Sequence, residues 1–198
     1  GADVKEDITV ESMGLENIPE LEALSSASLT DFTGMGVAPS PLDPHGAMTS
    51  YNQFEQNKVG YSVDFSGLPE LKQFTSVFYY LGPLEGVPGF ESRYFDASSR
   101  DLVFRMTGTG GVRVSVSDDV QVGTNPDGTP RFRTVHLEMK NLSSAKPFIR
   151  VRSQDLLRAL QDFHVNRITS VSIVSTRKNT GADVKEDITV ESMGLENI

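Results

Sequence analysis

Three histidines are the first candidates for acid–base chemistry or metal binding, because imidazole changes its charge near neutral pH. His45 lies among prolines and glycines, His136 in an alternating segment, and His164 at the end of a predicted helix. None has a second histidine or a carboxylate at a spacing typical of zinc sites, and no Gly-x-Ser-x-Gly turn marks a nucleophile. The sequence therefore predicts no catalytic residue, no metal and no cofactor, although a Ser–His–Asp triad assembled in space stays open.

Two short motifs are typical of turns rather than of ligand sites. The run Gly108–Gly111 lacks the Lys-Ser/Thr of a phosphate-binding loop, and a strand-like segment follows where such a loop would begin a helix. The pair Asp118 and Asp119, and Asp127 nearby, lack the density of oxygen ligands that calcium needs. We expect both motifs to serve the fold.

The charge is divided unevenly along the chain. The net charge is −9, yet residues 1–100 carry −10, residues 101–180 carry +5 and residues 181–198 carry −4. The chain has no cysteine, so disulfides and thiolate chemistry are excluded. No run reaches the roughly 18 apolar residues of a membrane span, and no membrane span is predicted.

Arginines concentrate in the basic part of the chain. Arg131 and Arg133 share one face of a predicted strand, as do Arg150 and Arg152. Clustered guanidinium groups bind phosphate backbones, pair with carboxylates across an interface, or lie on solvated strand faces. The overall acidity favours an interface over nucleic acid, which stays possible, and the solvated faces stay open as the plain alternative.

The most informative feature is a duplication: Gly1–Ile18 returns letter for letter as Gly181–Ile198. Its apolar residues alternate with polar ones, which predicts a half-buried strand ending at Gly14. Such a strand completes an open sheet edge through main-chain hydrogen bonds. The duplication is either a native tandem repeat or an engineered, appended copy. The predicted docking residues are Val4, Ile8 and Val10 in the first copy and Val184, Ile188 and Val190 in the second.

Most other elements predicted from the sequence are strands. A short helix is expected at 19–26 and a longer one at 154–163 with Ser153 as its N-cap. Turn residues at Asn125–Gly128 and at Gly108–Gly111 predict two hairpins. Strands are predicted at 61–65, 74–80, 101–107, 112–122, 131–140, 148–152 and 168–174.

These elements predict a mainly β fold, an antiparallel β-sandwich or jelly-roll-like body, with one helix near its C-terminal end and a terminal β-strand arm. We expect an acidic arm and a Pro/Gly-rich linker at 1–50, the body at 51–180 and the second peptide copy at 181–198.

The predicted function is a non-enzymatic structural module that assembles through strand pairing of its terminal peptide, as in a tandem surface repeat or a virion shell. Its predicted partners are neighbouring copies of itself, outside the cell or in a virion. The alternative is a small-ligand-binding or hydrolytic β-sandwich that uses the aromatic-rich region 74–95, although alternating aromatic residues are more often core.

Overall fold

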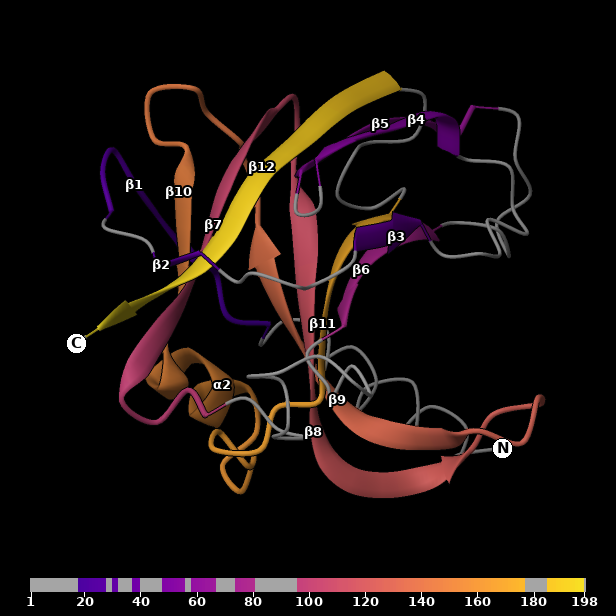
Figure 1. Ribbon diagram of the computed structural model, residues 1–198, viewed down its shortest axis with the longest axis vertical. Helices are drawn as coiled ribbons and strands as arrows, with labels where there is room; N and C mark the ends of the chain where they lie inside the picture. Colours follow the sequence, from indigo (N-terminus) through magenta and orange to yellow (C-terminus); the bar gives the residue numbers. More distant parts are fainter. Residues whose placement is uncertain are drawn as a thin grey trace, which may run out of the picture.

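The computed structural model describes residues 18–27, 30–31, 37–39, 48–55, 58–66, 74–80, 96–176 and 185–197. In this part of the chain, strands form two sheets whose pairings are antiparallel, accompanied by one α-helix (Figure 1). The predicted mainly β, antiparallel sandwich with a helix near its C-terminal end is therefore confirmed.

The first sheet has seven strands, with β2 paired to β12 beside the main order β1-β10-β7-β12-β5-β4. Its strands come from both ends and from the middle of the chain, so the sheet forms only when segments far apart in the sequence pair with each other. They are β1 (Glu22–Leu24), β2 (Thr30–Asp31), β4 (Met48–Glu55), β5 (Lys58–Asp64), β7 (Arg100–Gly108), β10 (Phe148–Val151) and β12 (Lys185–Asn197).

The second sheet has five strands in the order β3-β6-β11-β8-β9. They are β3 (Val37–Pro39), β6 (Phe74–Tyr80), β11 (Ser170–Thr176), β8 (Val112–Thr124) and β9 (Pro130–Met139). The seven strands predicted between residues 61 and 174 correspond to β5 through β11.

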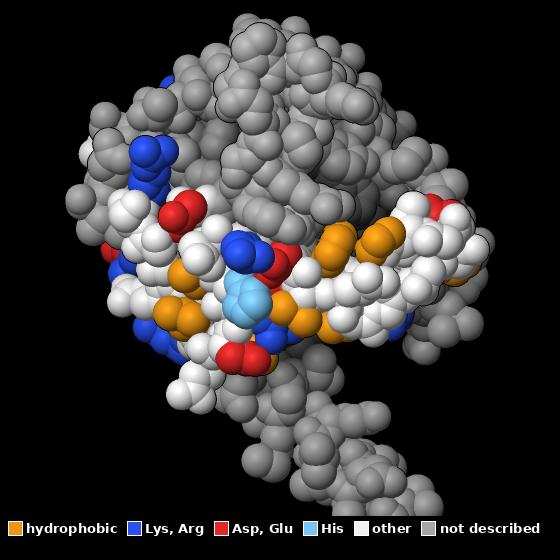
Figure 2. All heavy atoms as spheres, turned by 60° about the horizontal axis from the view of Figure 1, so that its bottom comes forward, with side chains coloured by type: hydrophobic (Ala, Val, Ile, Leu, Met, Phe, Trp, Pro, Cys, Tyr) orange, Lys and Arg blue, Asp and Glu red, His pale blue; other side chains and the backbone are white. Residues whose placement is uncertain are grey.

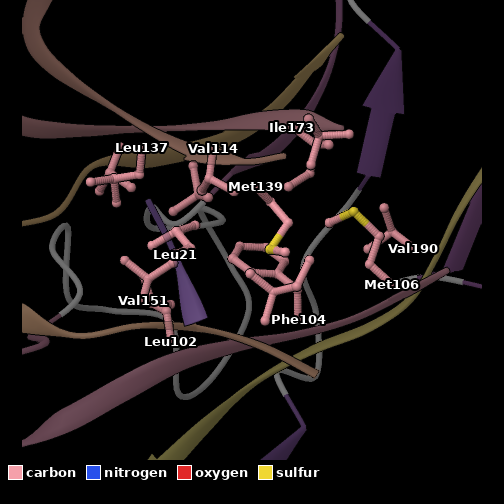
Figure 3. Close-up of a cluster of buried hydrophobic side chains, with 14 of the residues drawn as sticks. Leu21, Leu102, Phe104, Met106, Val114, Leu137, Met139, Val151, Ile173 and Val190 are labelled. Carbon is pink, nitrogen blue, oxygen red and sulfur yellow. The ribbon is translucent and has the colours of Figure 1, made fainter. Parts of the chain in front are cut away.

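Alternating apolar residues from both sheets form the core. Figure 3 shows Phe104 and Met106 of β7 on one side and Val114 of β8 on the other, all fully buried. Because a strand directs successive side chains to opposite faces, this alternation places polar residues such as Arg105 and Ser117 on the outer faces, although Val103 of β7 is also fully buried there. The wide aromatic and aliphatic core supplies the rigid scaffold on which outer-face residues are held.

The second copy of the repeated peptide forms β12, which lies in the interior of the first sheet. One edge of β12 pairs with β7 along the strand, and the other pairs with β5 from Lys185 to Val190 and with β2 at Gly194 and Leu195. The prediction that this strand stops at its glycine is wrong: β12 continues through Gly194 to Asn197 because β7 and β2 hold it there.

The stretch predicted as an arm and linker contributes paired strands to the body. Instead of the predicted helix at 19–26, β1 pairs with β10, and Leu21 is buried in the core. The Leu21 amide donates to the Glu138 carbonyl at 2.8 Å, and the Pro19 carbonyl accepts from the Glu138 amide at 2.9 Å. These contacts with β9 outweigh the weak helical pattern of the segment.

The helix α2 (Ser153–Ala159) is shorter than predicted, and its N-cap is Arg152 rather than Ser153. The Asp155 carboxylate accepts a hydrogen bond from the Arg152 amide at 2.9 Å, so the main-chain N–H group of the N-cap has a partner. Leu160 leaves the helix with φ −152°, and Phe163 is then buried in the core. Burial of Phe163 by the loop replaces the predicted continuation of the helix.

Of the two predicted hairpins, one is confirmed and one is wrong. Asn125–Gly128 joins β8 to β9, and Gly128 adopts the φ of +87° that the tight turn requires. Gly108–Gly111 instead carries the chain from β7 in one sheet to β8 in the other. Across the described ranges, no helix combines the length and apolar character that crossing a bilayer requires.

Candidate functional site

The outer face of the second sheet carries a dense group of hydroxyl side chains. Strand registry places polar residues of β11, β8 and β9 side by side in successive rows. The first row is Ser170, Ser117 and Thr134; the second is Ser172, Ser115 and His136; the third is Val174, Arg113 and Glu138. We call the six residues of the first two rows the hydroxyl face.

Hydrogen bonds between strands order this face. The hydroxyls of Ser117 and Thr134 lie 2.7 Å apart, and the Ser115 hydroxyl lies 2.8 Å from Nδ1 of His136. Ser115 and Ser172 are buried although they belong to the outer surface of the sheet, with 5 % and 8 % of their surface exposed. The second row is therefore held in place before any ligand arrives.

His136 is electrically neutral near pH 7. Burial lowers the pKa of its imidazole below the ordinary value, and the nearby positive charge of Arg113 lowers this pKa further. A neutral imidazole has one donor and one acceptor nitrogen, so with Ser115 it forms a hydrogen-bonding pair without charge.

A buried ion pair closes the end of β8 and β9 next to the hydroxyl face. Asp118, fully buried, accepts from Nε of Arg133 and from the His164 amide, both at 3.0 Å. Arg133 also donates to the Asp162 carboxylate at 3.0 Å, and its guanidinium lies 6.0 Å from the centre of the Phe163 ring. These contacts fix the loop after α2 onto the sheet, which is a structural role.

A second charged group lies at the surface of the same end. Nδ1 of His164 lies 2.7 Å from the Asp119 carboxylate, and Arg167 donates to the other oxygen of that carboxylate at 3.0 Å. The hydrogen bond with His164, followed by that with Arg167, lowers the pKa of Asp119. Figure 2 shows basic, acidic and histidine side chains side by side on this end of the molecule.

The two described histidines each have only part of a catalytic triad. His136 contacts a hydroxyl, and His164 contacts a carboxylate. Among the described residues, neither histidine contacts both. Nor do the described histidine, aspartate and glutamate side chains form a group of three that could hold a metal ion. The alternative of a hydrolytic site therefore gains no support from this geometry.

The predicted docking residues are only partly described. Ile188 and Val190 lie in β12 and are buried in the core of their own chain, with 1 % and 0 % of their surface exposed. The other four, which are Val4, Ile8, Val10 and Val184, lie outside the described residues, as does His45.

The four arginines that the sequence predicts at an interface do not lie together on one surface. Arg133 pairs with Asp118 on the second sheet, whereas Arg150 lies on the first sheet, 3.4 Å from the Asp101 carboxylate. Arg152 contacts Asp155 at 3.2 Å within the cap of α2. Arg131 is exposed on β9. Their role in an interface stays a prediction.

The aromatic-rich region 74–95 of the alternative function is described only as the backbone of β6 (Phe74–Tyr80). Sequence reasoning did not single out the hydroxyl face. The signal was present as alternating serines in two predicted strands, at 115 and 117 and at 170 and 172, but their adjacency depends on pairing between strands far apart in the chain.

Comparison with known proteins gives matches only among solved structures. No protein-family model and no curated protein matches the chain. The xyloglucanase domain of NopAA, a type three effector from Sinorhizobium fredii solved with cellobiose, is similar with a TM-score of 0.43 and 11 % identity, covering 87 % of this chain and 98 % of that one.

Two carbohydrate-binding modules are similar at the same level. A family 30 module has a TM-score of 0.44 and 9 % identity, covering 90 % of this chain and 96 % of its own. A family 28 module specific for non-crystalline cellulose has a TM-score of 0.38 and 12 % identity, covering 91 % and 97 %. Likenesses this distant do not assign a ligand to this chain.

The predicted function of a module that assembles through its terminal strand needs correction. Both hydrogen-bonding edges of β12 pair with strands of its own chain, so this copy completes its own sheet rather than joining a neighbour. With this copy paired inside its own sheet, the described residues fit the alternative, a ligand-binding β-sandwich, better than the predicted assembly.

Proposed function

We propose that this chain is a non-catalytic binding module whose ligand is a neutral, hydroxyl-rich molecule, a carbohydrate chain, held on the hydroxyl face. The observation that carries this proposal is the side-by-side placement of Ser and Thr hydroxyls and a neutral imidazole on three adjacent strands. The proposal moves the ligand site of the alternative function from the aromatic-rich region to the outer face of the second sheet.

Hydroxyl side chains suit a carbohydrate because each one both donates and accepts a hydrogen bond, as sugar hydroxyls do. Adjacent strands lie about 4.8 Å apart, and same-face residues along one strand lie about 7 Å apart. A face of this kind therefore offers polar contacts in two directions. Ser117 lies on the middle of its three strands, where a ligand crossing the face would contact it, and the buried Ser115 hydroxyl positions the exposed His136 ring beside it.

The electrostatics of the face favour a neutral ligand over a strongly charged one. Arg113 and Glu138 are cross-strand partners in the third row, so their opposite charges lie beside each other. The lowered pKa of His136 leaves its ring uncharged at neutral pH. A polyanion would meet one arginine with an acidic neighbour, which is a poor phosphate site.

The proposal gains its first test ligands from the similar solved structures. Cellobiose is bound to the NopAA domain, and non-crystalline cellulose is the stated specificity of the family 28 module. Cello-oligosaccharides and xyloglucan fragments are the ligands with which to begin. Self-association, predicted from the sequence, stays a prediction that light scattering at several concentrations would test.

The full chain is titrated with neutral and with acidic oligosaccharides, and isothermal calorimetry measures the affinity for each. Ser115→Ala and Ser117→Ala should each weaken binding several-fold, since one hydrogen bond contributes about 0.5–1.5 kcal/mol. Ser144→Ala is the matched control, because Ser144 is an exposed serine in the loop between β9 and β10 and is not one of the six residues of this face. Equal affinities in all three variants, or no binding of any sugar, would refute the proposal.

A further inference from the structure

The repeated peptide occupies a slot with a strand on each side. If β12 were withdrawn, β7 would lose its partner from Gly108 to Arg100, and β5 from Asp64 to Val59. Two strands with unpaired hydrogen-bonding groups would then face each other across a gap one strand wide. Such edges bind an extended peptide readily, because main-chain groups must be satisfied.

Side chains from the middle of the peptide pack into the core of the body. Ile188 and Val190 fill the core between the sheets (Val190 is labelled in Figure 3). Between them, Thr189 points to the other face and is only half-buried. The slot therefore selects apolar residues at alternate positions and tolerates polar ones between them.

The residue before Ile188 is held from both sides of the slot. The Ser62 hydroxyl of β5 donates to the Asp187 carboxylate. On the opposite side, the Thr109 amide donates to the Asp187 carbonyl at 3.2 Å, and the Asp187 amide donates to the Thr109 hydroxyl at 3.4 Å. These polar contacts set the register of the peptide.

Gly108 lies close to the backbone of the peptide. A Cβ atom at this position would lie 2.5 Å from the Asp187 carbonyl oxygen and 3.1 Å from Cα of Ile188. The slot is thus shaped to the backbone path of this strand as well as to its side chains. The peptide residues that make these contacts recur in the first copy, where Asp7, Ile8 and Val10 correspond to Asp187, Ile188 and Val190.

We infer that the slot between β5 and β7 is a peptide-binding site selective for this eighteen-residue sequence. β12 is its bound ligand in this structure, and Gly1–Ile18 is a second ligand able to fill it. The site belongs to the interior of the first sheet and is independent of the carbohydrate proposal for the second. Its recognition elements are the core positions that bury Ile188 and Val190, the Asp187 contacts and the close approach at Gly108.

The experiment replaces the buried isoleucine in each copy of the peptide. Ile188→Asp places a carboxylate in the core and disfavours docking of the second copy. Ile8→Asp does the same to the first copy, and the double variant weakens both. Thr189→Asp is the matched control, since it adds the same charge on the opposite face of the strand. Thermal unfolding is recorded for each full-length variant, with and without a synthetic peptide of the native eighteen residues.

The double variant should melt roughly 10 °C or more below the native chain, because a buried unpaired charge costs several kcal/mol. Added native peptide should restore most of this loss, whereas peptide carrying the aspartate should not. Ile188→Asp alone should lie above the double variant, because the first copy replaces the second. A double variant that native peptide does not restore would overturn the inference. Equal melting of the single and double variants would remove Gly1–Ile18 as a ligand.

A variant that fails to fold still gives an answer. The denatured double variant is diluted from urea into buffer with fluorescently labelled native peptide, and peptide anisotropy is measured beside circular dichroism. A joint rise in anisotropy and β signal supports the site. The milder pair Ile8→Ala and Ile188→Ala, which leaves a cavity rather than a charge, serves as a second variant; unchanged anisotropy with both would overturn the inference.

Discussion

Gly108 of β7 lies against the backbone of Ile188 in β12, and the two are partners across the sheet. A Cβ atom added at Gly108 would lie 3.1 Å from the Ile188 Cα, and closer still to the carbonyl oxygen before it. This contact occurs where β7 ends and the chain crosses to the other sheet. The missing side chain at Gly108 thus allows the last segment of the sequence to enter the middle of the sheet.

Replacement of Gly108 by alanine should destabilise the protein. Backbone atoms of β12 would have to shift, and overpacking of this kind costs typically about 1–3 kcal/mol. Urea unfolding followed by circular dichroism measures the change. Gly128→Asn is the control, because Gly128 has a positive φ that asparagine tolerates and no atom within 4 Å of an added Cβ. Equal stability of Gly108→Ala and the native chain would contradict the close contact.

The buried carboxylate of Asp118 should be the most sensitive charged group of the second sheet. Asp118→Asn leaves Arg133 facing a neutral amide and weakens the link to the loop at His164. Removing one member of a buried pair costs about 3–5 kcal/mol at most, and the amide retains part of the hydrogen bonding. We expect a loss near the lower end of this range in urea unfolding.

A double-mutant cycle separates the ion pair from other effects of these substitutions. Arg133→Gln alone should also destabilise, whereas Asp118→Asn combined with Arg133→Gln should cost less than the sum of the two. Asp127→Asn is the control, since Asp127 lies in the exposed turn and contacts only Thr129 among the described residues. Additive losses would show that Asp118 and Arg133 do not act as a pair.

The sequence predicts the faces of the strands better than their neighbours. Val114, Val116, Ser115 and Ser117 alternate, which predicts one buried and one polar face of β8. That Ser115 lies beside Ser172 depends on pairing between segments more than fifty residues apart, for which local periodicity has no signal. The fold class could therefore be predicted, but the hydroxyl face could not.

The two glycine-containing turns illustrate the same limit. Asn125–Gly128 and Gly108–Gly111 have similar turn chemistry, yet only the first joins neighbouring strands. At Gly108 the partner of β7 is the terminal strand, so the chain must leave the sheet. The end of α2 is likewise fixed by burial of Phe163, a tertiary contact that the apolar stripe of the sequence did not distinguish from further helix.

His136 should make stability depend on pH on the mildly acidic side. Its folded pKa is lowered by burial and by Arg113, so the unfolded chain, with a histidine pKa of about 6.5, binds the proton more readily. The stabilising contribution is therefore present above about pH 6.5 and is lost as pH falls toward the folded pKa. His136→Gln should flatten this part of the stability profile.

NMR titration of the His136 ring measures the shift directly. Arg113→Gln should raise the pKa of His136 only in part, because burial is the larger cause and remains in the variant. A His136 pKa at the ordinary histidine value would contradict the lowered pKa, and with it the uncharged ring that we assign to the hydroxyl face.

Asp119 should contribute to stability at the acidic end of the profile. Hydrogen bonds from His164 and then Arg167 lower its folded pKa, so the unfolded chain takes up the proton first, near pH 3.9. The contribution is complete above the unfolded value and is lost as pH falls through the folded one. Asp119→Asn should thus lower stability at neutral pH by less than about 1 kcal/mol, since surface pairs are weak. It should also reduce the slope of the unfolding free energy against pH below about pH 4.

Asp162→Asn is the matched control, because its carboxylate is 77 % exposed and contacts only Arg133 among the described side chains. An unchanged acid slope in Asp119→Asn would mean that the His164 and Arg167 contacts do not persist in solution.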